Sequence, residues 1–139
     1  MDRSLLDTDI LSEILKGRDP NVVANAAAYL SGFGDYLVST ITVIEIVRGL
    51  HRRGREEEIQ QSLTLPNIRL LTLDLRAAEL AGRIDADLER SGQSIGPIDP
   101  MIAAIALRHN LTLVTGNLFH YQRIQALGYE LHLDNWRTQ

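Results

Sequence analysis

The chain has 139 residues, 45% hydrophobic and 23% charged, with a formal net charge of −4 and no cysteine. This length and composition predict a single globular domain over residues 1–139, with a core of ordinary size. The missing cysteines exclude disulfides and thiolate metal sites, and no apolar run approaches the roughly 18 residues of a membrane span. We therefore expect a cytoplasmic protein without a membrane segment, in which any nucleic-acid contact needs a local basic patch or a bound cation.

Short apolar runs alternate along the chain with segments whose apolar residues recur at helical spacing. In chain order we predict a strand at residues 4–6, helices at 7–16 and 21–30, a strand at 36–39, helices at 42–50 and 55–63, a strand at 68–73, helices at 75–90 and 100–109, and strands at 111–114 and 130–133. Strands that alternate with helices favour an α/β fold with three layers, α/β/α, around a parallel sheet of four or five strands.

Four polar residues fall at predicted strand ends or helix starts. Asp7 and Asn117 follow strands, whereas Glu45 and Asp99 lie at or near the starts of helices. Ligands of parallel α/β sheets bind at the carboxyl ends of the strands, so these residues are positioned to form one site. Clustered carboxylates repel one another, and a divalent cation is the simplest compensating charge. The pattern therefore predicts metal-assisted chemistry at phosphate.

Each of these residues also has a purely structural interpretation. Asp7 suits the N-cap of the helix that follows it, and Asp99 suits an N-cap because Pro100 comes next. Glu45 stands at capping-box spacing from Thr42, and Asn117 after a glycine suits a turn. A scaffold in which every acid is a cap therefore stays open as an alternative.

Other phosphate chemistries fit the composition poorly. The aspartate-nucleophile phosphatases and phosphoacceptor receivers need a lysine far along the chain, and the only lysine is Lys16. There is no Gly-Lys-Ser/Thr sequence for a phosphate-binding loop. The histidines show no metal-ligand spacing, and we expect solvent-exposed positions for His51, His109, His120 and His132.

Basic residues cluster just after Glu45. Arg48 and Arg52 share a helical face with it, and Arg53 and Arg55 follow. One interpretation is a solvated helix end. The other is an edge that contacts phosphates beside the acidic site, for which arginine is well suited.

The motifs together resemble those of PIN domains, especially the VapC-type toxins of bacterial toxin–antitoxin pairs. Residues 5–12, Leu-Leu-Asp-Thr-Asp-Ile-Leu-Ser, are similar to the family opening, with Asp9 where asparagine is usual. Residues 39–45 resemble the second motif, residues 95–104 the third, and residues 114–117 the fourth, where many members carry aspartate instead of Asn117. The resemblance covers essentially the whole chain.

This resemblance implies an endoribonuclease that depends on Mg²⁺ or Mn²⁺ and inhibits translation by cutting RNA. It implies that Asp7, Glu45 and Asp99 are the catalytic, metal-binding acids, with Asn117 at the fourth position. It also implies a homodimer, a cognate VapB-type antitoxin, and a tRNA, rRNA or mRNA substrate. The alternative within the family is a catalytically weak PIN domain that binds RNA or protein.

Overall fold

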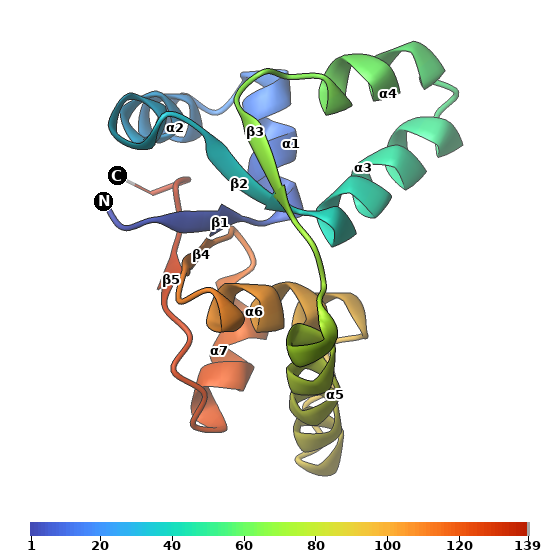
Figure 1. Cartoon of the computed structure of the whole chain (residues 1–139), viewed down its shortest axis with the longest axis vertical. Coiled ribbons are helices and arrows are strands. Elements are labelled where there is room, and N and C mark those ends of the chain that lie inside the picture. Colours follow the sequence, from blue (N-terminus) through green and yellow to red (C-terminus); the bar gives the residue numbers. More distant parts are fainter. Residues whose placement is uncertain (139) are drawn as a thin grey trace.

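The computed structural model describes residues 1–138 and contains a five-stranded, fully parallel sheet (Figure 1). The strands are β1 (Ser4–Leu6), β2 (Tyr36–Ser39), β3 (Ile68–Leu71), β4 (Thr112–Val114) and β5 (Leu133–Asp134), in the order β3-β2-β1-β4-β5. The helices are α1 (Thr8–Lys16), α2 (Pro20–Phe33), α3 (Thr40–Arg52), α4 (Glu56–Leu63), α5 (Leu75–Arg90), α6 (Ile98–Arg108) and α7 (Leu118–Ala126). The predicted three-layer α/β/α fold is confirmed.

Alternating side chains of the central strands build a separate core on each face of the sheet. Leu6, Val38 and Val114 lie in register across β1, β2 and β4, and they pack with α1 and α2. Leu5 and its register partners point to the opposite face and pack with α5, α6 and α7. Helices therefore cover both faces, which is why the central strands read as continuous apolar runs.

The carboxyl ends of the three central strands meet at one edge of the sheet. Leu6, Val38 and Val114 are paired there, so the residues that follow them, Asp7, Ser39 and Thr115, emerge side by side. Helix α3 starts directly after β2 without an intervening loop. This register brings the N-terminal ends of α1 and α3 and the segment after β4 to the same place.

Several predicted bounds differ from the structure by one to three residues; for example, the strand predicted at 68–73 ends at Leu71. Two elements near the end of the chain depart further from the expectation. The predicted strand at residues 130–133 is wrong in its bounds, because the chain turns at Tyr129–Leu131 and only Leu133 and Asp134 pair with β4. Helix α7 was not predicted at all. It buries only Tyr121 and Ile124 and leaves Phe119 66% exposed, so its sequence lacks a clear helical period.

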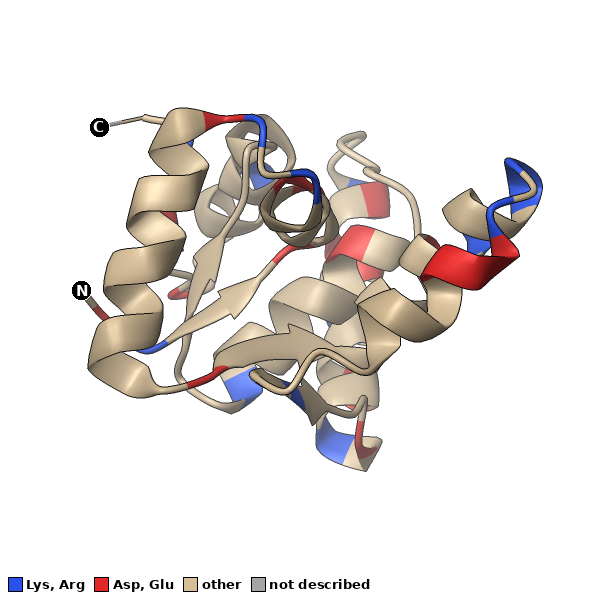
Figure 2. Cartoon of the chain, turned by 90° about the horizontal axis from the view of Figure 1, so that it is seen from above, with Lys and Arg blue, Asp and Glu red and all other residues tan. Residues whose placement is uncertain are grey.

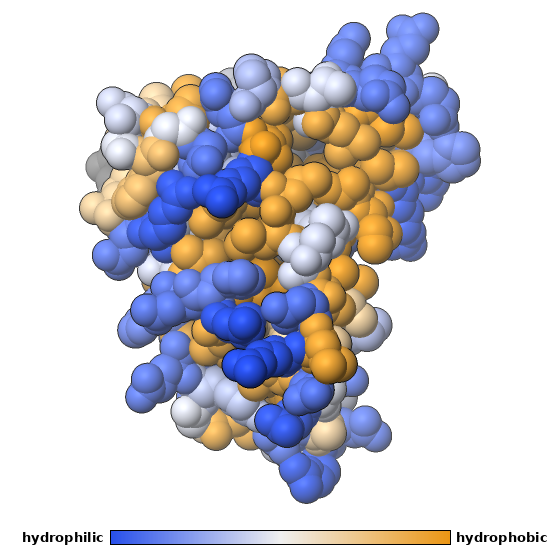
Figure 3. Space-filling view, viewed as in Figure 1, coloured by the Kyte–Doolittle hydropathy of each residue, from blue (hydrophilic) through white to orange (hydrophobic). Residues whose placement is uncertain are grey.

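Edge strand β3 leaves an apolar surface uncovered. A groove beside it is lined by residues of α1, β2, α3, α4 and β3: Leu11, Leu15, Val38, Val43, Ile46, Ser62, Leu63, Ile68 and Leu70. Figure 3 shows apolar side chains gathered over this region, next to the hydrophilic end of α3 and α4. Among residues 1–138, no helix has the length and apolar character that crossing a membrane requires.

Candidate functional site

An open depression lies at the carboxyl edge of the sheet, where the predicted residues converge. It is lined by Asp7, Thr8, Asp9, Glu45, Asp99, Gly116 and Asn117. Asp7, Glu45, Asp99 and Asn117 come from four separate segments. Asp7 and Asn117 directly precede α1 and α7, Asp99 lies in the first turn of α6, and Glu45 lies in the second turn of α3. The depression carries four carboxylates in all, those of Asp7, Asp9, Glu45 and Asp99.

Asp7 is the buried member of this group. Its side chain accepts hydrogen bonds at Oδ1 from the Thr8 amide (2.8 Å), and at Oδ2 from Thr115 Oγ1 (2.8 Å) and Tyr121 Oη (3.1 Å). Asp7 is only 6% exposed. Burial, and next the negative charge of Asp9, raise the pKa of Asp7 from 3.8 to about 7. Asp7 is thus firmly oriented, and its charged form is destabilised.

The Asp7 carboxylate does cap α1, as the structural interpretation expected, but the other two acids do not cap. Ser39 accepts from the Thr42 amide and caps α3, so the capping-box interpretation of Glu45 is wrong. Instead, the Thr8 hydroxyl donates to Glu45 Oε1 at 2.5 Å. Helix α6 begins at Ile98 without a side-chain cap, so the capping role expected of Asp99 is also wrong.

Asp99 contacts a histidine that the sequence interpretation placed in solvent. His120 Nδ1 lies 2.8 Å from Asp99 Oδ2 and 2.8 Å from Asn117 Nδ2. The His120 side chain is 37% exposed and that of Asp99 is 19% exposed. His120 therefore belongs to the margin of the site, three residues after Asn117 on the first turn of α7.

Asp9 is a second residue that sequence reasoning left outside the site. Its Oδ2 accepts from the Gly116 amide at 2.8 Å, and Arg137 Nε lies 3.9 Å from the same atom. Burial raises the pKa of Asp9, whereas the Gly116 amide and Arg137 oppose this shift. A Cβ atom at position 116 would come within 2.5 Å of Asp9 Oδ2, so glycine permits this contact.

The residues of the depression suit a hard divalent cation. Carboxylate oxygens are the preferred ligands of Mg²⁺, and a cation would offset the burial and the repulsion by Asp9 that raise the Asp7 pKa. Asp9 Oδ1 is buried and has no hydrogen-bond partner among residues 1–138, so it remains free to accept one. Within the same residues, no three His, Cys, Asp or Glu side chains already stand at ligand distances, so binding requires side-chain adjustment.

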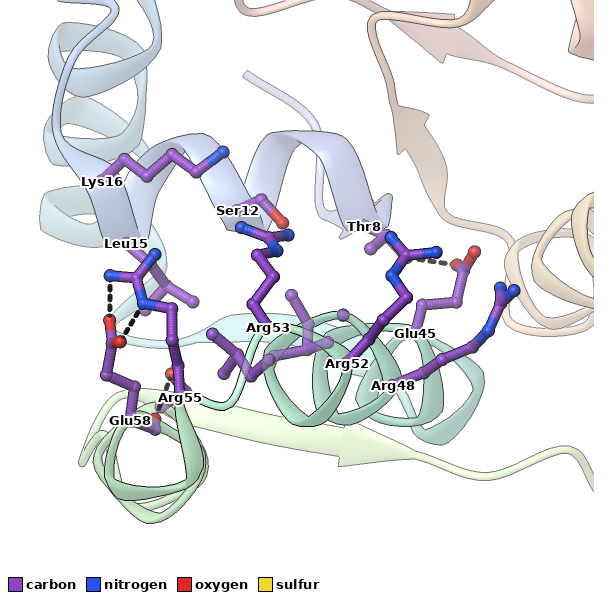
Figure 4. Close-up of a pocket in the computed structure, with 14 residues that line it drawn as sticks. Thr8, Ser12, Leu15, Lys16, Glu45, Arg48, Arg52, Arg53, Arg55 and Glu58 are labelled. Carbon is purple, nitrogen blue, oxygen red and sulfur yellow. Dashed lines mark hydrogen bonds and ion pairs between the residues drawn. The ribbon is translucent and has the colours of Figure 1, made fainter.

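A basic groove adjoins the acidic depression, and both include Thr8 and Glu45. Figure 4 shows the guanidinium groups of Arg52 and Arg53 extending from α3 toward α1, with Arg48 beside Glu45. Within residues 1–138, Arg48, Arg52 and Arg53 form no ion pair. Basic residues gather around the turn between α3 and α4 (Figure 2). The groove therefore offers unpaired positive charge next to the carboxylates.

Comparison with known proteins identifies the family. The family model of the PIN domain matches residues 4–121. "Ribonuclease VapC2" of Haemophilus influenzae is 33% identical over 138 residues, which cover 95% of this chain and 96% of that protein. The "tRNA(fMet)-specific endonuclease VapC" of Shigella flexneri is 29% identical over 128 residues, covering 91% of this chain and 95% of its own length.

The fold points to the same family. The structure of a DNA-bound VapBC complex from Salmonella typhimurium superimposes with a TM-score of 0.81 at 27% identity, and covers 98% of this chain and 99% of its counterpart. The agreement extends over the whole sheet and not over one motif alone. The chain therefore belongs to the PIN-domain family and, within it, to the VapC-type ribonucleases.

Proposed function

We propose that this chain is a divalent-cation-dependent endoribonuclease and the toxin of a toxin–antitoxin pair, with Asp7, Glu45 and Asp99 as its catalytic carboxylates and Asn117 beside them. PIN-domain ribonucleases depend in general on a divalent cation. The observation that carries the proposal is the convergence of these residues from four separate segments on one open depression. Family resemblance alone would not require their side chains to meet.

The side chains around the carboxylates support distinct roles for them. Thr115 and Tyr121 hold Asp7 Oδ2, and the Thr8 hydroxyl holds Glu45. Asp7 and Asp99 would bind Mg²⁺ or Mn²⁺ directly, and Glu45 would complete the metal-binding cluster or orient the attacking water. The bound cation would lower the pKa of water and stabilise the negative charge that develops on the phosphate oxygens. Asn117 adds an amide but no charge.

The direct test is cleavage of defined RNAs. We expect the purified chain to cut RNA with Mg²⁺ or Mn²⁺ and to be inactive in EDTA. The substrates should include tRNA, rRNA and mRNA fragments, and initiator tRNA among them, because the Shigella flexneri relative is named for tRNA(fMet). RNA that is bound but never cut under any of these conditions would favour the alternative, a PIN domain that acts as a binding module.

The basic groove leads us to predict a sequence-independent contribution to RNA affinity. Replacing Arg48 and Arg52 with alanine should weaken binding similarly across RNA sequences, because phosphate contacts carry no base information. Each phosphate contact contributes about 0.7 to the slope of log affinity against log salt for single strands, so the double variant should lose about 1.4. Titration of labelled RNA at several salt concentrations, in an Asp99→Asn background that does not cleave, measures this slope.

A matched control removes the same charge elsewhere. Arg76 and Arg83 are exposed on α5 and do not line the groove. Their double alanine variant should keep the wild-type salt slope. If the salt slope is unchanged in the Arg48/Arg52 variant, these arginines do not contact RNA phosphates and belong to a solvated helix end.

We further propose that a VapB-type antitoxin silences the site. Structural relatives of this chain are VapBC complexes, and the apolar groove beside β3 adjoins the basic groove through Leu15, Ile46 and Ser62. An antitoxin tail laid over the apolar groove could place an Arg or Lys against the carboxylates, where it would replace the charge of the cation. The complex purified with its antitoxin should therefore bind Mn²⁺ more weakly than the free chain. Equal Mn²⁺ affinity in calorimetry would contradict this mode of inhibition.

The homodimer stays a prediction, which light scattering of the free chain tests.

A further inference from the structure

Phe119 presents an aromatic ring to solvent beside the acidic depression. It is 66% exposed, and among residues 1–138 every other aromatic side chain is buried or half-buried. Phe119 stands on the first turn of α7, in sequence between Asn117, which lines the depression, and His120, which contacts Asp99. The one exposed ring of the described residues therefore lies at the margin of the site that is proposed to cut RNA.

Arg123 supports this ring from one face. Its guanidinium carbon lies 4.9 Å from the centre of the Phe119 ring, a cation–π contact between residues one helical turn apart. Arg123 Nη1 also donates long hydrogen bonds to the carbonyl oxygens of Ser94 (3.3 Å) and Gln93 (3.4 Å), in the segment before α6. Within residues 1–138 the Arg123 guanidinium group forms no ion pair. Arg123 therefore orients the ring and places positive charge beside it.

The surroundings of Phe119 suit a nucleobase better than a protein partner. The core of a protein interface is apolar, but Phe119 does not line the apolar groove beside β3, and the segment that Arg123 contacts is polar and exposed at Gln93 and Ser94. A single exposed ring is enough to stack on one base, because every base has a flat π face. Only an unpaired base can leave its own stack to meet such a ring.

We propose that Phe119, supported by Arg123, stacks on an unpaired base of the RNA, next to the phosphate that occupies the depression. This base site rests on the proposed function, because it requires an RNA strand that crosses the depression. The basic groove meets the depression at Thr8 and Glu45, whereas Phe119 follows Asn117. The groove then contacts phosphates, and Phe119 contacts a base. The substrate is accordingly an RNA with an unpaired nucleotide beside the bond that is cut.

Binding of two labelled strands tests this assignment without measuring activity. One is oligoadenylate of about ten nucleotides, and the other has the same length and phosphates but no bases. The parent protein is Asp7→Asn, which should not cleave and which leaves Asp99 and His120 unchanged. Adding Phe119→Ala should weaken oligoadenylate binding at least about fivefold. Affinity for the strand without bases, and the salt slope for both strands, should not change, because no phosphate contact is lost.

Two further variants serve as controls. Phe119→Trp keeps a stacking surface and should retain the affinity of the parent for oligoadenylate. Val23→Ala removes an exposed apolar side chain from α2, outside the depression and both grooves, and should change neither affinity.

The outcomes separate this inference from the proposed function. Oligoadenylate affinity that Phe119→Ala does not change, or an equal loss for the strand without bases, would overturn base stacking and leave the nuclease proposal intact. A lower mass of Phe119→Ala in light scattering would also overturn it, because a second copy of the chain would then cover the ring. A chain that neither binds nor cuts RNA would overturn both.

Discussion

Replacing Asp99 with asparagine is expected to abolish cation-dependent RNA cleavage while the protein remains folded. Asparagine keeps the shape of the side chain and an oxygen that can accept from His120, but it removes the charge that would bind the cation. The substitution should not destabilise α6 through a lost helix cap, because the Asp99 side chain does not cap this helix. Mutations of residues that only support metal ligands cost about 10- to 100-fold, so loss of a ligand should exceed about 100-fold.

Asp7→Asn should show a similar loss, and an initial-rate assay with an end-labelled RNA measures both. Asp2→Asn is the matched control, because it makes the same chemical change at an exposed carboxylate outside the depression. Circular dichroism of each variant checks that the fold is retained. If Asp7→Asn and Asp99→Asn both cut RNA at the wild-type rate, the assignment of the catalytic carboxylates is wrong.

The second large effect is on stability, and it depends on pH. The pKa of Asp7 rises from 3.8 to about 7 in the folded protein, so the fold binds this proton more tightly than the unfolded chain does. The resulting stabilisation is complete below about pH 4 and is lost as pH rises through 7. At about 1.4 kcal/mol per pKa unit, the cation-free protein should lose about 4 kcal/mol from this group between pH 4 and pH 8.

Asp7→Asn removes the titrating carboxyl group. The cation-free variant should therefore be more stable than the wild type at pH 8, but it should have no such advantage at pH 4. The gain is reduced by about 1 kcal/mol if the amide satisfies Thr115 and Tyr121 less well than the acid. Urea denaturation in EDTA at both pH values, with the wild type and the variant side by side, isolates the contribution of Asp7 because other titrating groups cancel. A difference between the two proteins that does not change with pH would contradict the burial argument.

A divalent cation bound at Asp7 should restore the stability that the protein loses when this carboxyl group ionises. Mn²⁺ at a hundredfold excess over its dissociation constant should stabilise the wild-type protein by about 2.7 kcal/mol. Asp7→Asn should gain much less, because it no longer supplies a charged ligand. If Mn²⁺ does not change the melting temperature of the folded wild-type protein, Asp7 does not bind a cation.

The sequence predicts the sheet better than it predicts the end of the chain. Strands such as residues 4–6 and 36–39 are recognisable because both of their faces are buried, so their apolar runs are unbroken. Helix α7 and strand β5 lack such a signal. Phe119 is exposed, and β5 is defined by two residues whose pairing with β4 depends on the turn at Tyr129–Leu131.

The site shows a similar division between local pattern and tertiary contact. Asp7, Asp99 and Asn117 stand at strand ends or helix starts, and Glu45 lies one turn further along α3, so the topology brings all four to one edge. The partners of these residues do not follow from position. His120 reaches Asp99 from a helix that the sequence did not reveal, and Asp9 meets Gly116 and Arg137 more than a hundred residues away. The three-residue spacing from Asn117 to His120 would have placed both on one helical turn, had α7 been recognised.

The most direct test of the proposed catalytic centre is the location of bound Mn²⁺. Crystals soaked in MnCl₂ and measured near the manganese absorption edge should give an anomalous peak in the depression, in contact with the carboxylates of Asp7 and Asp99. The peak should be absent from Asp99→Asn crystals treated in the same way. An enzyme that cleaves RNA with Mn²⁺, but whose only anomalous peaks lie outside the depression, would contradict the account.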